Sequence, residues 1–390
     1  MRKTKIITYA FVALVCLALV TGCSPSAPAP REAETIKIGG IFEITGDMAE
    51  FGIKGENGVK LAIREINNSG GVLGKQIEYV GADNRSDAEE SKVAATKLII
   101  QDKVVGIVGP MTNLNTLAVI PVVSENKIPL ITPTGTNTIL TVNERGELNE
   151  WIFRACFIDS FQGEVAANFA LDTIKAKTAA LIIDQKGDYA KSLAASFKEI
   201  FEAGGGKVVA TEQYIAGQDK NFYNILTRIR AENPDVIFVP GHYNDSGFIV
   251  RQARDLKIQA AVLGGDLWGT GPIADVAGAE AMNNTYYVDH VAVNDPELAD
   301  FAAAYKAEYG QDIDSFATLG YDAAKLLLAA IERAGNTDAE AIKRALESTS
   351  GFNGVSGEIN VDPATHNPKK SASIQKFVDG LKVFATRVDP

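Results

Sequence analysis

Cysteine and histidine are both scarce in this sequence, which contains only three of each among 390 residues. We expect Cys16 to be removed with a signal peptide and Cys23 to carry lipid, so that Cys156 has no intrachain disulfide partner. Cys156 lies in an apolar run and is typical of a buried structural cysteine. The histidines show none of the spacings typical of metal ligands, so the sequence predicts no metal site.

Positive charge is also in deficit, because 38 Lys and Arg residues face 49 Asp and Glu residues and give a formal net charge of −11. An acidic chain of this kind argues against a nucleic acid as the partner. The sequence further lacks a G-x-S-x-G nucleophile elbow, a phosphate-binding P-loop and a complete dinucleotide fingerprint. We therefore predict that the protein is not an enzyme and needs no cofactor.

Long apolar stretches are missing except at the N-terminus. Residues 6–20 are almost entirely apolar and follow a basic cluster at Arg2, Lys3 and Lys5, but the run is shorter than the ~20 residues that span a bilayer. This is the plan of a signal peptide, predicted at residues 1–22. The run ends in Val-Thr-Gly-Cys and resembles the lipobox of bacterial lipoproteins, in which Cys23 is lipidated. A plain signal peptide that happens to contain a cysteine is the alternative.

Residues 23–35 are rich in Pro, Ala and Ser and contain no large apolar residue. They are predicted to form an extended, semi-rigid tether between the membrane and the folded body. The protein is thus expected outside the cytoplasm, anchored to the cell membrane through Cys23.

From residue 36 onward, short apolar runs alternate with amphipathic segments. A capping box of Ser86 and Glu89 predicts the start of one helix, which would bury Val93. Strands are expected at 36–42, 76–80, 104–108, 128–131, 179–183, 208–211, 235–239 and 261–263. Helices are expected at 55–68, 87–101, 117–126, 189–203, 221–232 and 245–256. This alternation predicts an α/β fold with parallel, doubly wound sheets, whose ligands bind at the carboxyl ends of the strands.

Strands and helices alternate in two successive series, and the chain first passes from one series to the other near residues 153–159. Two such series predict two lobes with a cleft between them. Helices at 296–309 and 315–334 suggest that the chain returns to the first lobe. We predict that lobe 1 comprises residues 36–155 and about 290–350, and that lobe 2 comprises residues 156–289 and about 351–390.

An ordered series of motifs from residue 36 to about residue 362 resembles the branched-chain amino-acid-binding family of ABC importers, which has the type I periplasmic-binding-protein fold. The series begins with Gly39-Gly40-Ile41-Phe42 and Thr45-Gly46, followed by Phe51-Gly52. It continues with Glu65-Ile66-Asn67, Gly70-Gly71-Val72-Leu73-Gly74, Ile107-Val108-Gly109-Pro110, Pro129-Leu130-Ile131-Thr132-Pro133, Asp188-Tyr189, Val239-Pro240-Gly241-His242-Tyr243 and Leu263-Gly264-Gly265-Asp266.

The resemblance implies a set of ligand-binding residues. Asn113 stands where the family has a carboxylate-binding serine, Thr136 matches its usual threonine, and Asp266 matches the acid that binds the ammonium group. Thr112 and Thr134 belong to the same carboxylate-binding turns. Aromatic walls match Phe51, Tyr189 and Tyr243.

The chemistry of a zwitterionic amino acid agrees with this set, because its carboxylate needs donors at strand-to-helix turns and its ammonium needs a poorly solvated acid. Structural alternatives stay open. Thr112 and Asn113 could cap the following helix, and Thr136 could satisfy local backbone. Asp266 could cap a turn, and Phe51 or Trp268 could belong to a core. We expect Asp184 to organise its own turn.

The sequence as a whole predicts a monomeric, lipid-anchored solute-binding protein that delivers a branched-chain or related amino acid to ABC permease subunits in the membrane. One alternative is a sensor domain of the same fold, which would usually be fused to a signalling module. A second is a binder of amides or amine-free carboxylates, because Asn113 and Asn115 suggest a more polar pocket. A third alternative is a lipoprotein enzyme, but the sequence contains no recognisable catalytic constellation.

Overall fold

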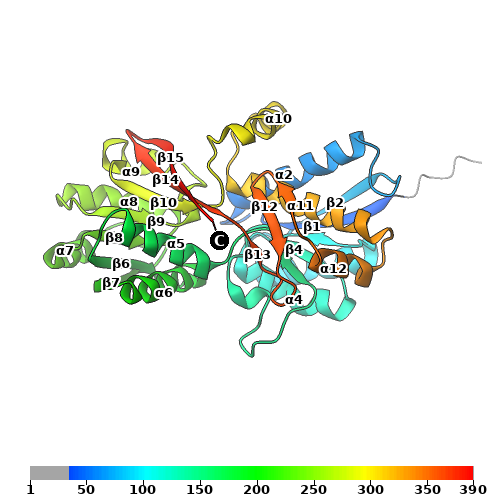
Figure 1. The fold of residues 1–390 in the computed structure, drawn as a ribbon, viewed down its shortest axis with the longest axis horizontal. Coiled ribbons are helices and arrows are strands. Elements are labelled where there is room, and N and C mark those ends of the chain that lie inside the picture. Colours follow the sequence, from blue (N-terminus) through cyan, green and yellow to red (C-terminus); the bar gives the residue numbers. More distant parts are fainter. Residues whose placement is uncertain (1–34, 390) are drawn as a thin grey trace, which may run out of the picture. The chain divides into compact units, whose positions relative to one another are not determined.

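A computed structural model describes residues 35–389 and contains two large sheets, each within its own set of helices (Figure 1). The predicted signal peptide, the lipidation site Cys23 and nearly all of the tether lie outside the described residues. The first sheet is entirely parallel, with the order β2-β1-β3-β4-β5. Its strands are Ile36–Phe42 (β1), Ile77–Asp83 (β2), Ile107–Val108 (β3), Leu130–Thr132 (β4) and Ile152–Arg154 (β5). The inner strand β1 is buried except at Lys37, as expected of a strand covered on both faces.

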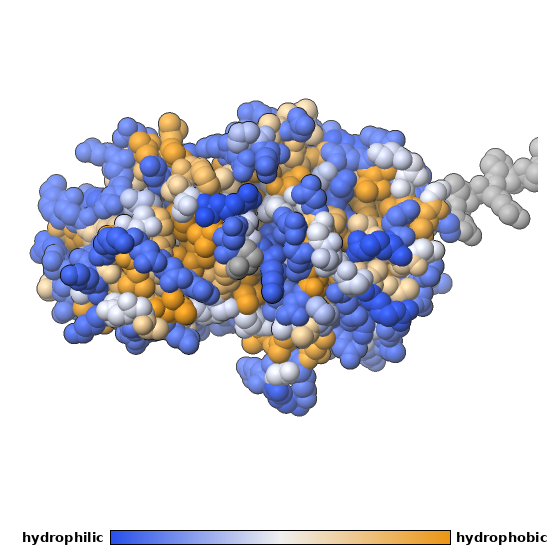
Figure 2. Space-filling view, in the orientation of Figure 1, coloured by the Kyte–Doolittle hydropathy of each residue, from blue (hydrophilic) through white to orange (hydrophobic). Residues whose placement is uncertain are grey.

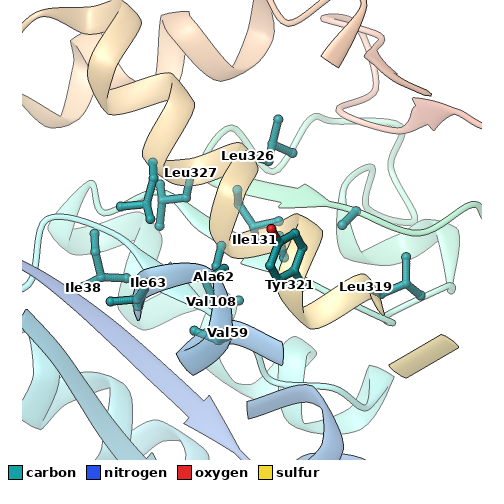
Figure 3. Close-up of a cluster of buried hydrophobic side chains, with 14 of the residues drawn as sticks. Ile38, Val59, Ala62, Ile63, Val108, Ile131, Leu319, Tyr321, Leu326 and Leu327 are labelled. Atoms are coloured by element: carbon teal, nitrogen blue, oxygen red, sulfur yellow. The ribbon is translucent and has the colours of Figure 1, made fainter. Parts of the chain in front are cut away.

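Helices cover both faces of the first sheet. They are Ala49–Asn68 (α2), Ala88–Lys97 (α3), Asn113–Asn126 (α4), Ala299–Tyr309 (α10), Ser315–Ala334 (α11) and Ala339–Glu347 (α12). The side chains of β1, α2 and α11 point toward one another in one core (Figure 3). Two glycines permit the close crossing of α2 and α11, since a Cβ at Gly58 would lie 2.1 Å from the carbonyl oxygen of Ala317 and one at Gly320 would lie 2.2 Å from that of Gly55.

The second sheet has the order β15-β14-β10-β9-β8-β6-β7, in which β6 to β10 are parallel and β14 and β15 are antiparallel. Its strands are Thr178–Asp184 (β6), Lys207–Tyr214 (β7), Val236–Val239 (β8), Ala261–Gly264 (β9), Thr285–Asp289 (β10), Ala372–Val378 (β14) and Leu381–Val388 (β15). The predicted α/β fold is confirmed, with an antiparallel hairpin added at the edge. Asp379 and Gly380 form its turn with φ angles of 50° and 81°, the conformation that an Asp-Gly pair favours.

Five helices cover the second sheet: Asp159–Asp172 (α5), Asp188–Ala203 (α6), Tyr223–Glu232 (α7), Tyr243–Asp255 (α8) and Ile273–Ala277 (α9). Helices α5 and α6 lie on one face of the sheet, and α7, α8 and α9 lie on the other (Figure 1). The side chains of each set form a core with the sheet. Like the first sheet, this one is therefore doubly wound.

A small third sheet corrects the predicted lobe boundary. It comprises Phe352–Gly354 (β11), Gly357–Val361 (β12) and Pro368–Lys369 (β13). We expected residues from about 351 to belong to the second lobe, but Ile359 and Val361 are buried in the core that α2 and α11 share. Burial of these two side chains keeps β11 to β13 with the first sheet, and the chain reaches the second sheet only at β14.

Two local predictions around α3 were also wrong. The N-cap of α3 is Asp87, whose carboxylate accepts hydrogen bonds from the backbone of Glu89 and Glu90. The hydroxyl of Ser86 instead bonds to Met48 and Thr45, because the strand-to-helix loop folds back onto the loop after β1. Val93 is 64% exposed, since α3 uses Ala94, Ala95 and the following residues for its contact with the sheet.

On the face shown in Figure 2, patches of hydrophobic residues are interspersed among hydrophilic ones. Large exposed hydrophobic side chains occur on the β14–β15 hairpin, namely Val378, Leu381 and Phe384. Within residues 35–389, no helix combines the length and apolar character that a bilayer crossing requires.

Candidate ligand-binding site

A cavity of about 250 Å³ lies where loops at the carboxyl ends of both sheets meet. The loops after β1, β3 and β4 and the start of α11 contribute one wall, and the loops after β6, β8 and β9 contribute the other. The residues lining the cavity are Met48, Phe51, Met111, Thr112, Asn113, Leu114, Thr134, Thr136, Lys186, Gly187, Asp188, Tyr189, His242, Asp266, Leu267 and Phe316. This location is the one that parallel α/β sheets favour for ligands.

Polar side chains on the first wall come from the two loops that follow β3 and β4. The hydroxyl of Thr134 donates to the carbonyl oxygen of Met111 at 2.7 Å and so joins these loops. The amide oxygen of Asn113 accepts from the backbone N–H of Asn137 at 3.2 Å, which orients the amide NH₂ group as a donor. Thr136 also lines the cavity and is 2% exposed. The first wall therefore presents hydroxyl and amide groups.

The hydroxyl of Thr112 also lines the cavity but has local partners. It accepts from the backbone N–H of Asn115 at 3.4 Å, as an N-cap of α4, and donates to Glu43 at 3.1 Å. The capping alternative left open by the sequence is thus realised for this side chain. A ligand that binds the hydroxyl of Thr112 therefore has to compete with these two hydrogen bonds.

Asp266 is the acid on the second wall, and two residues bind its carboxylate. The hydroxyl of Tyr189 donates to Oδ1 at 2.6 Å, and Nε2 of His290 lies 3.0 Å from Oδ2. Burial alone would raise the pKa of Asp266, but the hydrogen bonds and the attraction of His290, followed by those of Tyr189 and Gln162, outweigh it and lower the pKa. Asp266 therefore carries a buried negative charge at neutral pH.

Apolar and aromatic side chains form the remainder of the cavity. Phe51 lies between Phe316 and His242, with ring centroids 5.1 Å and 5.7 Å apart. Burial lowers the pKa of His242, so its ring is neutral at pH 7. Thioether and aliphatic side chains at Met48, Met111, Leu114 and Leu267 complete the lining. The cavity thus combines one buried charged side chain, Asp266, with largely apolar walls, whereas the charged side chains of Lys186 and Asp188 are exposed.

The structure brings all the predicted binding residues to this cavity except Tyr243. Tyr243 is not among the residues that line the cavity, and its hydroxyl donates to Glu50 on α2 at 3.0 Å. Trp268 is fully buried in the core beside α8, which is the core alternative for that residue. Asp184 accepts from the backbone N–H groups of Lys186 and Ala216 and so organises its own turn, as expected.

Sequence reasoning missed several residues of the site, among them His242 and Phe316, and it also missed Glu43 behind the cavity. His242 directly precedes the predicted Tyr243, and of these two neighbours His242 is the one that lines the cavity. Phe316 comes from α11, far from the strand-end loops in sequence, and only its position at a helix start could have indicated it. Glu43 does not line the cavity but lies behind it, fully buried at the end of β1, and bonds to Met111 and Thr112.

Metal and thiol chemistry have no visible basis in this region. Across residues 35–389, no cluster of His, Cys, Asp and Glu is arranged to hold a metal ion. Cys156 is fully buried, its Sγ lies 3.4 Å from the carbonyl oxygen of Gly135, and burial raises the pKa of its thiol to about 12. A thiol that stays protonated at neutral pH is not a nucleophile, in agreement with a structural role.

Comparisons with known proteins agree with this geometry. A family model described as periplasmic binding protein matches residues 35–381. The Leu/Ile/Val-binding protein BraC3 of Rhizobium johnstonii is 33% identical over 366 residues, which are 92% of this chain and 95% of that protein. The branched-chain amino acid transporter substrate binding protein LivJ of Streptococcus pneumoniae, solved in complex with isoleucine, is 36% identical with a TM-score of 0.83, and the match covers 92% of this chain and 100% of that one. The leucine binding protein LivK of Thermotoga maritima is 33% identical with a TM-score of 0.82, over 91% and 99% of the two chains.

Proposed function

Because this chain belongs to the periplasmic binding protein family, we propose that it is the solute-binding component of an ABC importer and that its ligand is an α-amino acid with an aliphatic side chain. The observation that carries the proposal is one cavity in which the charged carboxylate of Asp266 faces hydroxyl and amide donors across apolar walls. An amino acid has the matching distribution of charge, with an ammonium, a carboxylate and a side chain on one carbon.

Asp266 binds the ammonium group in this proposal. Its carboxylate is 2% exposed and is oriented by Tyr189 and His290. A buried carboxylate gains most from a ligand that brings a positive charge and N–H donors, since the charge-assisted hydrogen bonds then form in a poorly solvated cavity. Neutral amides and amine-free acids would leave this charge without a partner.

The ligand carboxylate is bound by the first wall, through Asn113 and the turn that contains Thr134 and Thr136. These groups follow β3 and β4, where hydroxyl, amide and backbone N–H donors gather at the ends of parallel strands. Phe51, Phe316 and the neighbouring thioether and aliphatic groups then surround the side chain. This apolar surround favours leucine, isoleucine or valine over charged or strongly polar amino acids.

Binding between the two walls favours the closed arrangement of the lobes. We assign to lobe 1 the first sheet with β11 to β13, and to lobe 2 the second sheet. Contacts between them already flank the cavity, because Lys54 donates to the carbonyl oxygen of Thr270 at 2.8 Å and Tyr243 to Glu50 at 3.0 Å. A ligand that contacts both lobes adds to these bonds, and the closed form then docks on the permease and releases its amino acid there.

The location follows from the family and from the N-terminal sequence together. Periplasmic binding proteins act outside the cytoplasm, and we propose that this one is anchored to the membrane as a monomer by a lipid on Cys23. Mass spectrometry of the purified chain tests the anchor, since the mature N-terminus should begin at Cys23 with an added diacylglyceryl mass. A mature N-terminus at any other residue would overturn it.

Ligand-dependent thermal unfolding tests the function. The full chain in mild detergent would be melted with each of the twenty amino acids and with simple carboxylates and amides. A ligand at a hundred times its dissociation constant adds about 2.7 kcal/mol to the free energy of unfolding. We expect a clear rise in Tm with leucine, isoleucine or valine. A rise only with amine-free acids or amides would overturn the amino-acid proposal and leave a solute-binding role.

A further inference from the structure

Glu43 lies directly behind the first wall of the cavity, and its hydrogen bonds go to that wall. The side chain is 0% exposed. Its Oε2 accepts from the backbone N–H of Met111 at 3.2 Å. Its Oε1 accepts from the backbone N–H of Thr112 at 3.3 Å, from the hydroxyl of Thr112 at 3.1 Å and from Nδ2 of Asn115 at 2.8 Å. A carboxyl group whose two oxygens both accept and neither donates has the bonding pattern of the ionised form.

This internal carboxylate lies beside the N-terminal end of α4, which is the end of a helix that attracts anions. Backbone N–H groups at the N-terminus of a helix carry partial positive charge and bind carboxylates and phosphates. Here the donors at Met111 and Thr112 already bond to Glu43, on the side of the wall away from the ligand. Glu43 therefore partly offsets the positive end of α4, and the backbone N–H groups of Asn113 and Leu114, the first residues of the helix, are not among its partners.

Two buried negative charges, Glu43 and Asp266, thus lie next to or within one small cavity. Among the residues that line it, Lys186 is a cation and Asp188 an acid, and both side chains are exposed and screened by water. An amino acid brings an ammonium group that compensates Asp266. An amine-free acid of the same shape brings the same carboxylate without that ammonium group, so its net negative charge is repelled by both buried carboxylates where solvent is excluded.

We propose that Glu43 is a specificity-determining residue, whose buried charge makes the cavity select zwitterionic amino acids over the corresponding 2-oxo acids. Glu43 acts through Met111, Thr112 and Asn115 and does not itself contact the ligand. This inference rests on the proposed function, because it concerns how the same cavity discriminates between ligands. It adds to the effect of Asp266, which selects for the ammonium group directly.

Isothermal titration of the full chain in mild detergent tests the inference, with leucine, isoleucine and valine and their three 2-oxo acids as probes. The measured quantity is the ratio of dissociation constants for each oxo acid and its amino acid. We expect at least a hundredfold preference for the amino acid in the wild type. Glu43→Gln should reduce that preference roughly tenfold, because it removes the charge and keeps the side-chain shape.

A matched control is Asp322→Asn. Asp322 is also fully buried and accepts from two backbone N–H groups and a hydroxyl, at Val355 and Ser356, but does not line the cavity. Its replacement should lower stability and leave the ratio unchanged. A rescue variant, Glu43→Gln with Asn115→Asp, returns the negative charge to the partner atom 2.8 Å away and should restore the wild-type ratio.

The outcomes separate the two proposals. If the wild type binds an amino acid and Glu43→Gln leaves the ratio unchanged, the inference is wrong and the proposed function stands. If the wild type binds an oxo acid as tightly as its amino acid, the inference fails without any variant, even where Glu43→Gln does not fold. If the wild type binds none of the amino acids, the proposed function fails and the inference fails with it.

Discussion

The hydroxyl of Tyr189 donates a 2.6 Å hydrogen bond to Asp266, although 77 positions separate the two residues in the sequence. The loops after β6 and β9 bring them together at the carboxyl edge of the second sheet. His290 lies against the other carboxylate oxygen, and its ring stacks on Phe157 at a centroid distance of 3.7 Å. The acid of the site is thus fixed in orientation before a ligand arrives, which lowers the cost of binding.

Replacing Asp266 with Asn is expected to weaken amino-acid binding by about a hundredfold. The variant keeps the size of the side chain but removes the charge that would pair with the ligand ammonium. Isothermal titration with leucine measures the loss. Asp245→Asn is the control, because that acid is also buried but bonds to Gly217 outside the cavity and should change affinity less than threefold. Equal losses in both variants would contradict an ammonium site at Asp266.

His242 and Tyr243 are neighbours in sequence, and their substitutions should behave differently. His242 lines the cavity beside Phe51, so His242→Ala leaves a void against the ligand and should weaken binding at least tenfold. Tyr243→Phe removes only the partly exposed bond to Glu50 and should cost less than threefold. The dissociation constants of both variants for leucine test this expectation. A larger loss of affinity in Tyr243→Phe than in His242→Ala would show that Tyr243 contacts the ligand, as the sequence predicted.

Lys54 is expected to stabilise the closed form without contacting the ligand. Its ammonium lies 2.9 Å from Asp314 on its own lobe and donates to Thr270 on the other lobe at 2.8 Å. Burial alone would lower the pKa of Lys54, but attraction to Asp314 and Glu50 outweighs burial and raises the pKa, so the side chain stays charged. Lys54→Met should therefore accelerate ligand dissociation about five- to tenfold.

Stopped-flow displacement measures that rate, and Lys60→Met provides the control. Lys60 lies on the same helix and pairs with Glu56 at 2.6 Å within α2, so its loss should not affect closure. Small-angle scattering in the presence of leucine adds a second observation, because the Lys54 variant should show a larger radius of gyration than the wild type. A change in stability without a change in dissociation rate would limit Lys54 to a structural role.

Much of this fold could be predicted from the sequence because buried parallel strands leave a local signal. The apolar run of β1 was found at its observed bounds, 36–42, and most later strands and helices were found within a few residues. The lobe boundary was misplaced because Ile359 and Val361 lie in short strands whose pattern does not show which core they enter. The Asp379-Gly380 turn of the antiparallel hairpin did leave a signal, which was not used.

The site was harder to predict because its specificity depends on side-chain direction. The family resemblance, supported by position at strand ends, pointed to Asp266, Tyr189 and Thr136, each of which lines the cavity. Position could not tell which of His242 and Tyr243 faces inward, since this depends on the start of α8. Nor could it show that Glu43 bonds to Thr112 across 69 positions, because this hydrogen bond exists only after β1 and β3 have paired in the first sheet.

Asp159 allows a prediction about pH. It is fully buried at the start of α5, and neither carboxylate oxygen has a partner in good hydrogen-bond geometry. Burial raises the pKa of Asp159 from 3.8 to about 6, although the nearby hydroxyls of Thr136 and Ser192 partly oppose it. Between pH 4 and 6 the unfolded chain therefore releases this proton before the folded chain does. The folded state should lose up to about 3 kcal/mol over that interval.

Asp159→Asn removes this titration. The variant and the wild type should therefore have equal free energies of unfolding near pH 4. The variant should become increasingly more stable than the wild type up to pH 6, and the difference should stay constant above pH 6. Urea unfolding at several pH values measures it. Asp83→Asn is a control of opposite sign, because hydrogen bonds from Thr45 and Arg85 outweigh burial and lower the pKa of Asp83. The stability that Asp83 contributes is present above its unfolded pKa and is lost as the pH falls through its folded pKa, so this variant should lose most stability at neutral pH. A difference for Asp159→Asn that does not change with pH would mean that the buried carboxylate is ionised in the folded protein across the whole range.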